Sequence, residues 1–133
     1  MRILFITLFF IISFSLSICS QSYIKEADIK KLEVKYQACL DNGDYMLGCS
    51  NQFYVEMDSC LNVAYKQLRQ TSDELVKAAL KKEQLEWLKI RDRKFAYIDK
   101  TNKDEGQDGE MFRRDEKANF VKERVLVLIR KLN

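Results

Sequence analysis

The chain has 133 residues, 47% of them hydrophobic and 32% charged, so it is long enough for one small domain with its own core. Its formal net charge of +3 is close to neutral and the charges alternate in sign, which excludes the concentrated basic stripe of a nucleic-acid-binding protein. The chain contains no His, which excludes Ser-His and Cys-His nucleophilic chemistry and His-ligated metal sites.

Residues 1–20 have the pattern of a signal peptide. Arg2 precedes an apolar run over residues 3–16, which is shorter than the ~20 residues that a membrane span needs. An ordinary signal peptidase could cleave near residues 19–21. The sequence LSIC that ends at Cys19 also resembles a lipobox, so Cys19 is a candidate for lipidation, although Ile18 is bulkier than the residue usual before such a Cys. The leader predicts export to the periplasm or the exterior, with a lipid anchor at the cell envelope or a retained membrane anchor as alternatives.

Export permits disulfides, and three Cys remain after the leader. Cys39 and Cys49 flank residues 41–44 (DNGD), a strong turn signal. A disulfide between them would close a short loop and stabilise the fold by roughly 2–3 kcal/mol. Cys60 is then left over. It acts either as a small buried hydrophobe or as an exposed thiol that bridges to a second molecule.

The periodicity of apolar residues predicts four helices after the leader, over residues 22–40, 44–70, 73–99 and 111–132. Asn42-Gly43 ends the first helix. Thr71 as N-cap, with Glu74 three residues later, forms a capping-box start for the third helix. The absence of Pro and the low Gly content favour such long helices. The sequence therefore predicts an all-α fold, a small antiparallel bundle of about four helices, as a single domain over residues 21–133.

The second and third helices are predicted to form the central hairpin of the bundle, because only a couple of residues separate them. The second helix carries an apolar stripe at helical spacing, made of Phe53, Met57, Leu61, Ala64 and Leu68. The predicted apolar faces of the other helices are Ile29, Leu32, Tyr36 and Cys39 in the first, Leu75, Ala78, Ala79, Leu85, Trp87, Leu88, Phe95 and Ile98 in the third, and Ala118, Val121, Val125, Leu128 and Leu132 in the last.

A polar line runs beside each apolar stripe of this hairpin. Its members are Asp58, Asn62 and Tyr65 in the second helix and Gln84, Trp87, Arg91 and Asp92 in the third. An active site is one interpretation, but a structural role is favoured, because Arg91 could reach Asp58 across the hairpin and fix the register of the two helices. No nucleophile-base set and no metal-ligand cluster is visible, so the sequence predicts no enzyme, no cofactor and no metal site.

The spacing of these residues resembles the LprI-type lysozyme-inhibitor domain, a small exported bacterial domain. The residues that carry the resemblance are Cys39, Cys49, Asp58, Leu61, Asn62, Tyr65, Gln84, Trp87, Arg91, Asp92 and Arg124. By this resemblance Cys39 and Cys49 are the first cysteine pair of the family, while a second pair is absent, since Phe95 and Glu116 stand in its places. The resemblance implies a non-catalytic protein that binds and blocks lysozyme. The alternative is a structural or adaptor domain of the envelope that does not inhibit lysozyme.

The polar segment before the last helix is predicted to be a protruding loop. Lysozymes are often cationic, so an acidic loop could enter the substrate cleft of one. The predicted partner-binding residues are Asp104, Glu105, Asp108 and Glu110. The segment also partly mimics an EF-hand calcium loop, but Gly106 supplies no ligand at the third position and Asp115 replaces the bidentate Glu, so a solvated loop is favoured. The predicted partner is lysozyme or another envelope protein, with no nucleic acid and no membrane contact except through a lipid anchor.

Overall fold

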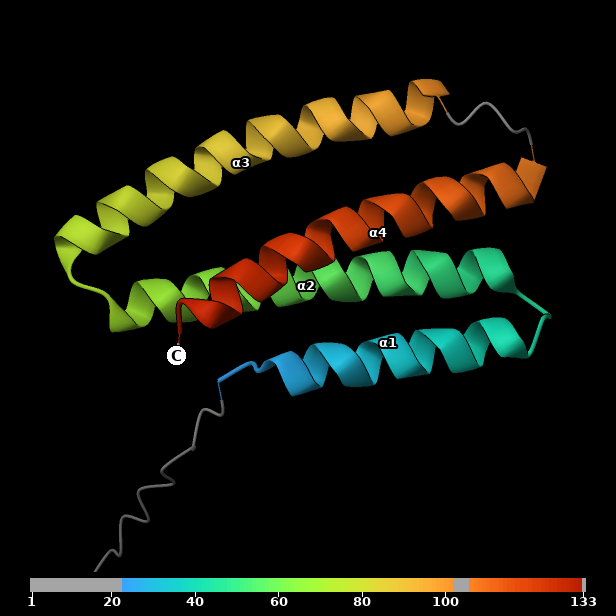
Figure 1. Cartoon of the computed structure of the whole chain (residues 1–133), viewed down its shortest axis with the longest axis horizontal. Coiled ribbons are helices and arrows are strands. Elements are labelled where there is room, and N and C mark those ends of the chain that lie inside the picture. Colours follow the sequence, from blue (N-terminus) through green and yellow to red (C-terminus); the bar gives the residue numbers. More distant parts are fainter. Residues whose placement is uncertain (1–22, 102–105, 133) are drawn as a thin grey trace, which may run out of the picture.

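The computed structural model describes residues 23–101 and 106–132, and within these ranges the chain forms four helices and no strand. The helices are α1 (Glu26–Asp41), α2 (Met46–Thr71), α3 (Glu74–Thr101) and α4 (Gly106–Arg130). Successive helices run in opposite directions, so α2 and α4 are parallel to each other (Figure 1). The predicted all-α antiparallel bundle is confirmed. The leader with Cys19 lies outside the described residues.

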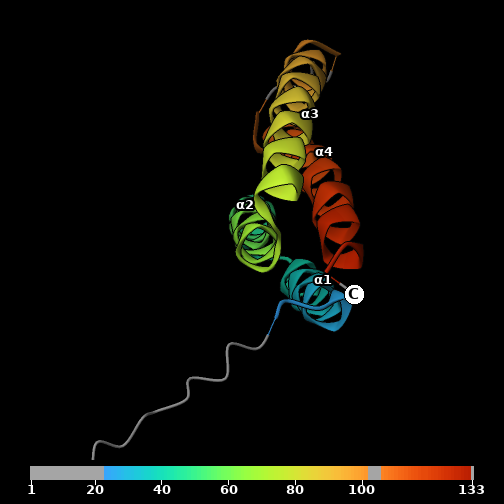
Figure 2. The ribbon, with the colours of Figure 1, turned by 90° about the vertical axis from the view of Figure 1, so that its left-hand side faces the viewer.

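The core of the bundle lies between α2 and α4, which are in contact along most of their lengths (Figures 1 and 2). The stripe predicted on α2 is buried from Phe53 to Leu68 and meets the apolar face of α4. The buried residues of that face are Ala118, Val121, Val125, Leu128 and Ile129. Burial of a side chain of this kind contributes about 1.5–3 kcal/mol. The contact between these two parallel helices is therefore the main source of hydrophobic stabilisation.

α1 and α3 lie on opposite sides of the α2/α4 pair, so that the cross-section of the bundle is a flattened diamond (Figure 2). α1 buries Ile29 and stacks Tyr36 on Phe53, with ring centroids 4.4 Å apart. It also reaches α4 through an ion pair of 2.8 Å between Glu33 and Lys122. α1 is thus joined to both core helices, whereas it makes no contact with α3 within the described residues.

The structure differs from the predicted central hairpin in how α2 and α3 pair. The two helices are consecutive and antiparallel, but they diverge after their turn, and α3 packs mainly on α4 (Figure 1). The reason lies in the sequence of α3, where charged residues interrupt the apolar stripe. The Val- and Leu-rich face of α4 therefore buries more apolar area against α2 than α3 could bury there. α2 and α3 are therefore joined by a short turn, as in a hairpin, but the contact between them is not the core of the bundle.

The side of α3 that faces the bundle is only partly the predicted one. Ile98 is buried and Trp87 and Phe95 are half-buried, as predicted. Leu75 and Leu85, however, are 85% and 50% exposed. The inward line of α3 consists of Leu80, Gln84, Trp87, Arg91, Phe95 and Ile98, which follow one another at spacings of three or four residues.

The N-cap of α3 is Asp73, and the prediction that Thr71 caps this helix is wrong. The Asp73 carboxylate accepts a hydrogen bond of 2.8 Å from the backbone N–H of Val76. Thr71 is instead the last residue of α2, where its hydroxyl donates to backbone carbonyl oxygens of the preceding turn. An Asp is among the strongest N-caps, because its carboxylate accepts from an amide that has no helical partner.

Candidate functional site

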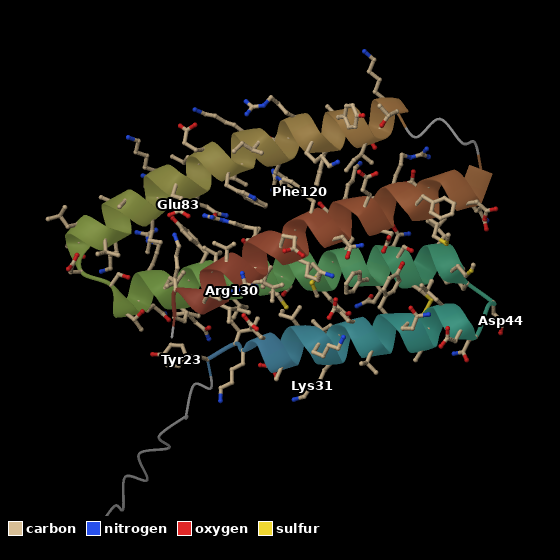
Figure 3. All side chains as sticks on the ribbon, in the orientation of Figure 1. Tyr23, Lys31, Asp44, Glu83, Phe120 and Arg130 are labelled. Carbon is tan, nitrogen blue, oxygen red and sulfur yellow. A yellow bond between two sulfur atoms is a disulfide. The ribbon has the colours of Figure 1, made fainter. Side chains whose placement is uncertain are left out.

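The polar contact that fixes α3 on α4 centres on Arg124, a residue only 8% exposed (Figure 3 labels its partner Glu83). Its guanidinium donates two hydrogen bonds of 2.9 and 3.1 Å to the side-chain oxygen of Gln84 and pairs with Glu83 at 2.8 Å. Lys131 pairs with the same Glu83 carboxylate at 2.6 Å. Hydrogen bonds from Lys131 and then from Arg124 hold the pKa of Glu83 below its ordinary value. Since the buried charge of Arg124 is satisfied on both sides, this cluster acts as a clamp between the two helices.

Aromatic rings and cations alternate along the rest of the α3/α4 contact. Phe120 of α4 lies between Trp87 and Phe95 of α3, at centroid distances of 6.0 and 6.3 Å. The guanidinium groups of Arg124 and Arg91 lie 5.7 and 5.9 Å from the Trp87 centroid. Each contact of this kind contributes about 0.5–1 kcal/mol at a partly exposed position. Contacts between rings and cations therefore contribute more to the packing of α3 on α4 than contacts between aliphatic side chains do.

The structure brings together only part of the predicted polar cluster. Gln84 and Trp87 meet around Arg124, a residue of the family pattern for which the sequence predicts no role. Arg91 pairs with the neighbouring Asp92 at 2.8 Å, and in the described residues no ion pair joins it to Asp58. The predicted Asp58–Arg91 contact is wrong, because α2 and α3 diverge where that contact would form.

The polar residues of α2 stay within their own helix. The Asn62 amide donates a hydrogen bond of 3.0 Å to the backbone carbonyl of Asp58, one turn earlier. Tyr65 is half-buried and carries the Arg69 guanidinium 5.9 Å from its ring centroid. These residues therefore extend from the middle of α2 toward the α2–α3 turn and take no part in the Arg124 cluster.

We expect Glu83 and Arg124 to be energetically coupled, and Asp58 and Arg91 to be independent. In a double-mutant cycle, Glu83→Gln and Arg124→Ala should show a coupling energy of about 0.5–3 kcal/mol, because they remove one shared ion pair. The effects of Asp58→Ala and Arg91→Ala should add. Urea unfolding of the two cycles measures both results. Coupling between Asp58 and Arg91 with none between Glu83 and Arg124 would contradict this assignment.

The residues of the predicted partner-binding loop do not form a protruding loop where they are described. Asp104 and Glu105 lie outside the described residues. Asp108 and Glu110 are helical, because α4 begins at Gly106, five residues earlier than predicted. Glu110 pairs with Arg113 at 3.0 Å, and this hydrogen bond is the main cause of its lowered pKa.

The EF-hand alternative is wrong, because α4 runs without a break through the residues that would have to curl around a calcium ion. EF-hand ligands come from a twelve-residue loop and not from successive turns of one helix. In the part of the chain that the structure describes, no group of three His, Cys, Asp or Glu is close enough to hold a metal ion.

The predicted disulfide between Cys39 and Cys49 is confirmed, with Cα atoms 5.8 Å apart. It ties the end of α1 to the start of α2 across a turn in which Gly43 has a φ of 75°, a conformation that favours glycine. Cys60 is free and half-buried, and it packs against the core. Burial raises the pKa of its thiol, which fits the interpretation of Cys60 as a small hydrophobe.

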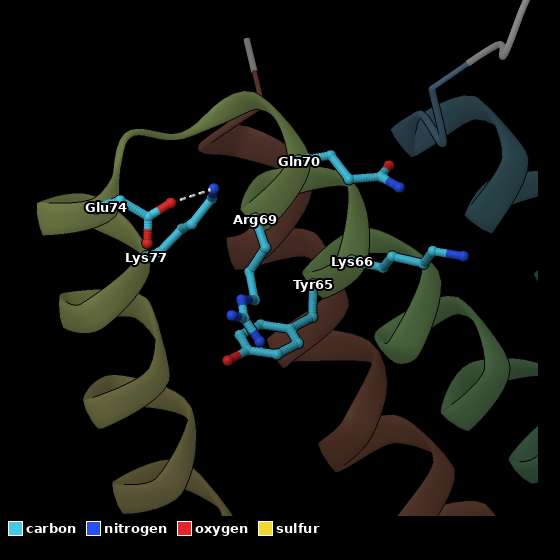
Figure 4. A pocket seen from close by; sticks show the side chains of 6 residues that line it. All are labelled: Tyr65, Lys66, Arg69, Gln70, Glu74 and Lys77. Carbon is cyan, nitrogen blue, oxygen red and sulfur yellow. Dashed lines mark hydrogen bonds and ion pairs between the residues drawn. The ribbon is translucent and has the colours of Figure 1, made fainter.

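Two surface hollows lie at opposite ends of the bundle. The first, of about 430 Å³, lies at the α2–α3 turn and is lined by Tyr65, Lys66, Arg69, Gln70, Glu74 and Lys77 (Figure 4). The second, of about 330 Å³, is lined by Tyr36, Gln37, Leu40, Met46, Met111, Phe112 and Asp115. The first hollow has three cationic side chains and one carboxylate, whereas the second is largely apolar with one carboxylate.

Among the described helices, none has both the length and the apolar character that a membrane span requires. A family model described as "Lysozyme inhibitor LprI" matches residues 39–128, more than half of the chain. The matched range includes both disulfide cysteines, all of α2 and α3, and most of α4. No curated protein and no solved structure matches the chain.

Proposed function

Because the chain belongs to the LprI lysozyme-inhibitor family, we propose that it is an exported, non-catalytic protein that binds lysozyme and blocks its activity. The observation that carries the proposal is the family match itself, which spans the disulfide and nearly all of the α2/α4 core. We further propose that residues 1–20 are a signal peptide. Mass spectrometry of the mature N-terminus distinguishes simple cleavage from lipidation at Cys19.

The electrostatic state of the described side chains supports a binding role over a catalytic one. A nucleophilic Cys needs a lowered pKa, whereas burial raises the pKa of Cys60. A carboxyl group that serves as a general acid needs a raised pKa. Glu33, Glu83 and Glu110 have lowered pKa values, mainly because a Lys or Arg side chain donates a hydrogen bond to each carboxylate. These shifts are the signature of structural ion pairs.

A turbidity assay tests the proposal. Mature protein, residues 21–133, is added to lysozyme and a suspension of bacterial cells, and the rate of clearing is followed. We expect the rate to fall in proportion to the added protein and to level off near equimolar amounts, as for a cleft-blocking inhibitor. A helical protein of similar size and net charge serves as the control. Clearing at the control rate in molar excess, with lysozymes of more than one structural class, would refute the proposal.

One observation favours the alternative of an adaptor domain in the envelope. The outer face of α3 leaves large apolar side chains exposed, namely Leu75, Val76, Leu85 and Ile90. Apolar groups gathered on one helix are typical of a surface that contacts another protein. The same turbidity assay separates the two functions, because an adaptor domain does not slow clearing.

A further inference from the structure

The end of the bundle away from the α2–α3 turn carries a surface that the helix contacts leave free. We propose that the hollow between α1, the start of α2 and the start of α4, with its rim of carboxylates, docks a cationic segment of the partner protein. This acidic hollow consists of the lining residues Tyr36, Leu40, Met46, Met111, Phe112 and Asp115, and Asp41, Asp44 and Asp108, each within four residues of a lining residue, are taken as its rim. The inference rests on the proposed function, and it names lysozyme as the owner of the cationic segment.

The floor of the acidic hollow is apolar and open. Leu40 and Tyr36 come from α1, Met46 from α2, and Met111 and Phe112 from α4. Phe112 is 51% exposed, so its ring is accessible to a partner protein. Aromatic and Met side chains are enriched where proteins bind one another. A volume of about 330 Å³ has room for one or two inserted side chains of a partner.

Asp108, Phe112 and Asp115 share one face of α4, because they follow each other at spacings of four and three residues. Asp41 follows the lining residue Leu40, and Asp44 lies in the α1–α2 turn at the same end of the bundle (Figure 3 labels Asp44). Burial raises the pKa of Tyr36, and the charge of Asp115 and a side-chain hydrogen bond to it raise this pKa further, so the Asp115 carboxylate lies near the phenol. The carboxylates therefore come from both segments that supply the apolar floor, the α1–α2 turn and the start of α4.

None of these four carboxylates forms an ion pair within the described part of the chain, whereas Glu33, Glu83 and Glu110 are each paired with Lys or Arg. Asp41 and Asp115 accept hydrogen bonds of 2.8 and 3.1 Å from the neutral side-chain amides of Gln37 and Asn119. Uncompensated negative charge around an apolar floor is complementary to a cationic, partly apolar partner surface. The hollow of Figure 4, at the opposite end of the bundle, differs in charge, because three cations and one carboxylate line it.

Contacts within the protein also preorganise the acidic hollow for binding. The Cys39–Cys49 disulfide joins the helix ends that supply Leu40 and Met46. A hydrogen bond of 2.9 Å between the hydroxyl groups of Tyr36 and Ser50 fixes α1 on α2 one turn away. A preorganised surface binds more tightly, because less conformational entropy is lost on association.

Charge and contact variants test the proposal. The variant Asp41→Asn/Asp44→Asn/Asp108→Asn removes three rim charges, and Phe112→Ser removes the exposed ring. We expect each variant to raise the dissociation constant for lysozyme by about tenfold or more at low salt, and the charge variant to weaken the salt dependence of binding. The matched control Glu74→Gln/Glu86→Gln/Glu123→Gln removes the same number of charges elsewhere and should stay within about twofold of the wild type.

The outcomes separate this inference from the proposed function. If lysozyme binds the wild type and both test variants equally, the inference is overturned and the proposed function stands. If lysozyme does not bind the wild type, the proposed function fails, and an NMR titration of the labelled protein with a cationic peptide of Lys and Leu decides the inference. Shifts of the Met46 and Phe112 amide signals would support the acidic hollow as a cation-binding surface. Shifts elsewhere, or none, would overturn it.

Discussion

Replacing Leu128 by Ala is expected to lower the free energy of unfolding by about 2–5 kcal/mol, because this fully buried side chain lies in the α2/α4 contact. The loss combines the missing transfer free energy of the side chain with the cost of the cavity that remains. The matched control is Leu85→Ala on α3, the same chemical change at a 50% exposed position. We expect this control to cost less than about 0.5 kcal/mol. Urea unfolding followed by circular dichroism measures both changes.

The comparison tests which pair of helices forms the core. If Leu85→Ala destabilises the protein as much as Leu128→Ala, Leu85 is buried in solution. The face of α3 that the sequence predicts, with Leu75 and Leu85, then packs against the core. Similar m-values for both variants are needed, since a changed m-value would report a different denatured or native state.

Removing the disulfide through Cys39→Ala/Cys49→Ala is expected to lower the free energy of unfolding by roughly 2–4 kcal/mol, because the closed loop, with a sequence separation of 10, restricts the unfolded chain. The variant should also bind lysozyme more weakly, since the disulfide holds one wall of the acidic hollow. Thermal unfolding of the variant, and of the wild type with and without a reducing agent, measures the first effect. The half-buried Cys60→Ala serves as the control and should cost less than about 1 kcal/mol. A wild-type midpoint that does not respond to reduction would refute this role of the disulfide.

The elements with one dominant apolar face could be predicted from the sequence. On α2, the stripe from Phe53 to Leu68 is buried throughout, because no competing face of that helix has comparable apolar residues. On α3, apolar residues lie on more than one face, so periodicity alone could not decide between Leu85 and Leu80. The choice depends on the neighbouring helix, which supplies Phe120 and Arg124 and so selects the side with Gln84 and Trp87.

The candidate site was harder to predict than the fold. The expected Asp58–Arg91 contact assumed that consecutive helices pack along their whole length, and the non-local α2/α4 contact takes precedence. A signal for Arg124 was present, since it lies between Val121 and Val125 on a buried face, where a charged group needs a partner. The acidic hollow had no comparable signal, because its two walls come from segments at opposite ends of the domain sequence.

The parallel pairing of α2 with α4 has a consequence for the order of events in folding. The apolar stripe of α2 finds its partner only in the last helix, after α3 has been added to the chain. Contacts between distant segments form late, since a long intervening stretch must first be ordered. Until α4 has been synthesised, the apolar stripe of α2 therefore lacks the helix that buries it. By the same logic, proteases that clip the C-terminal helix would leave a remnant unable to refold.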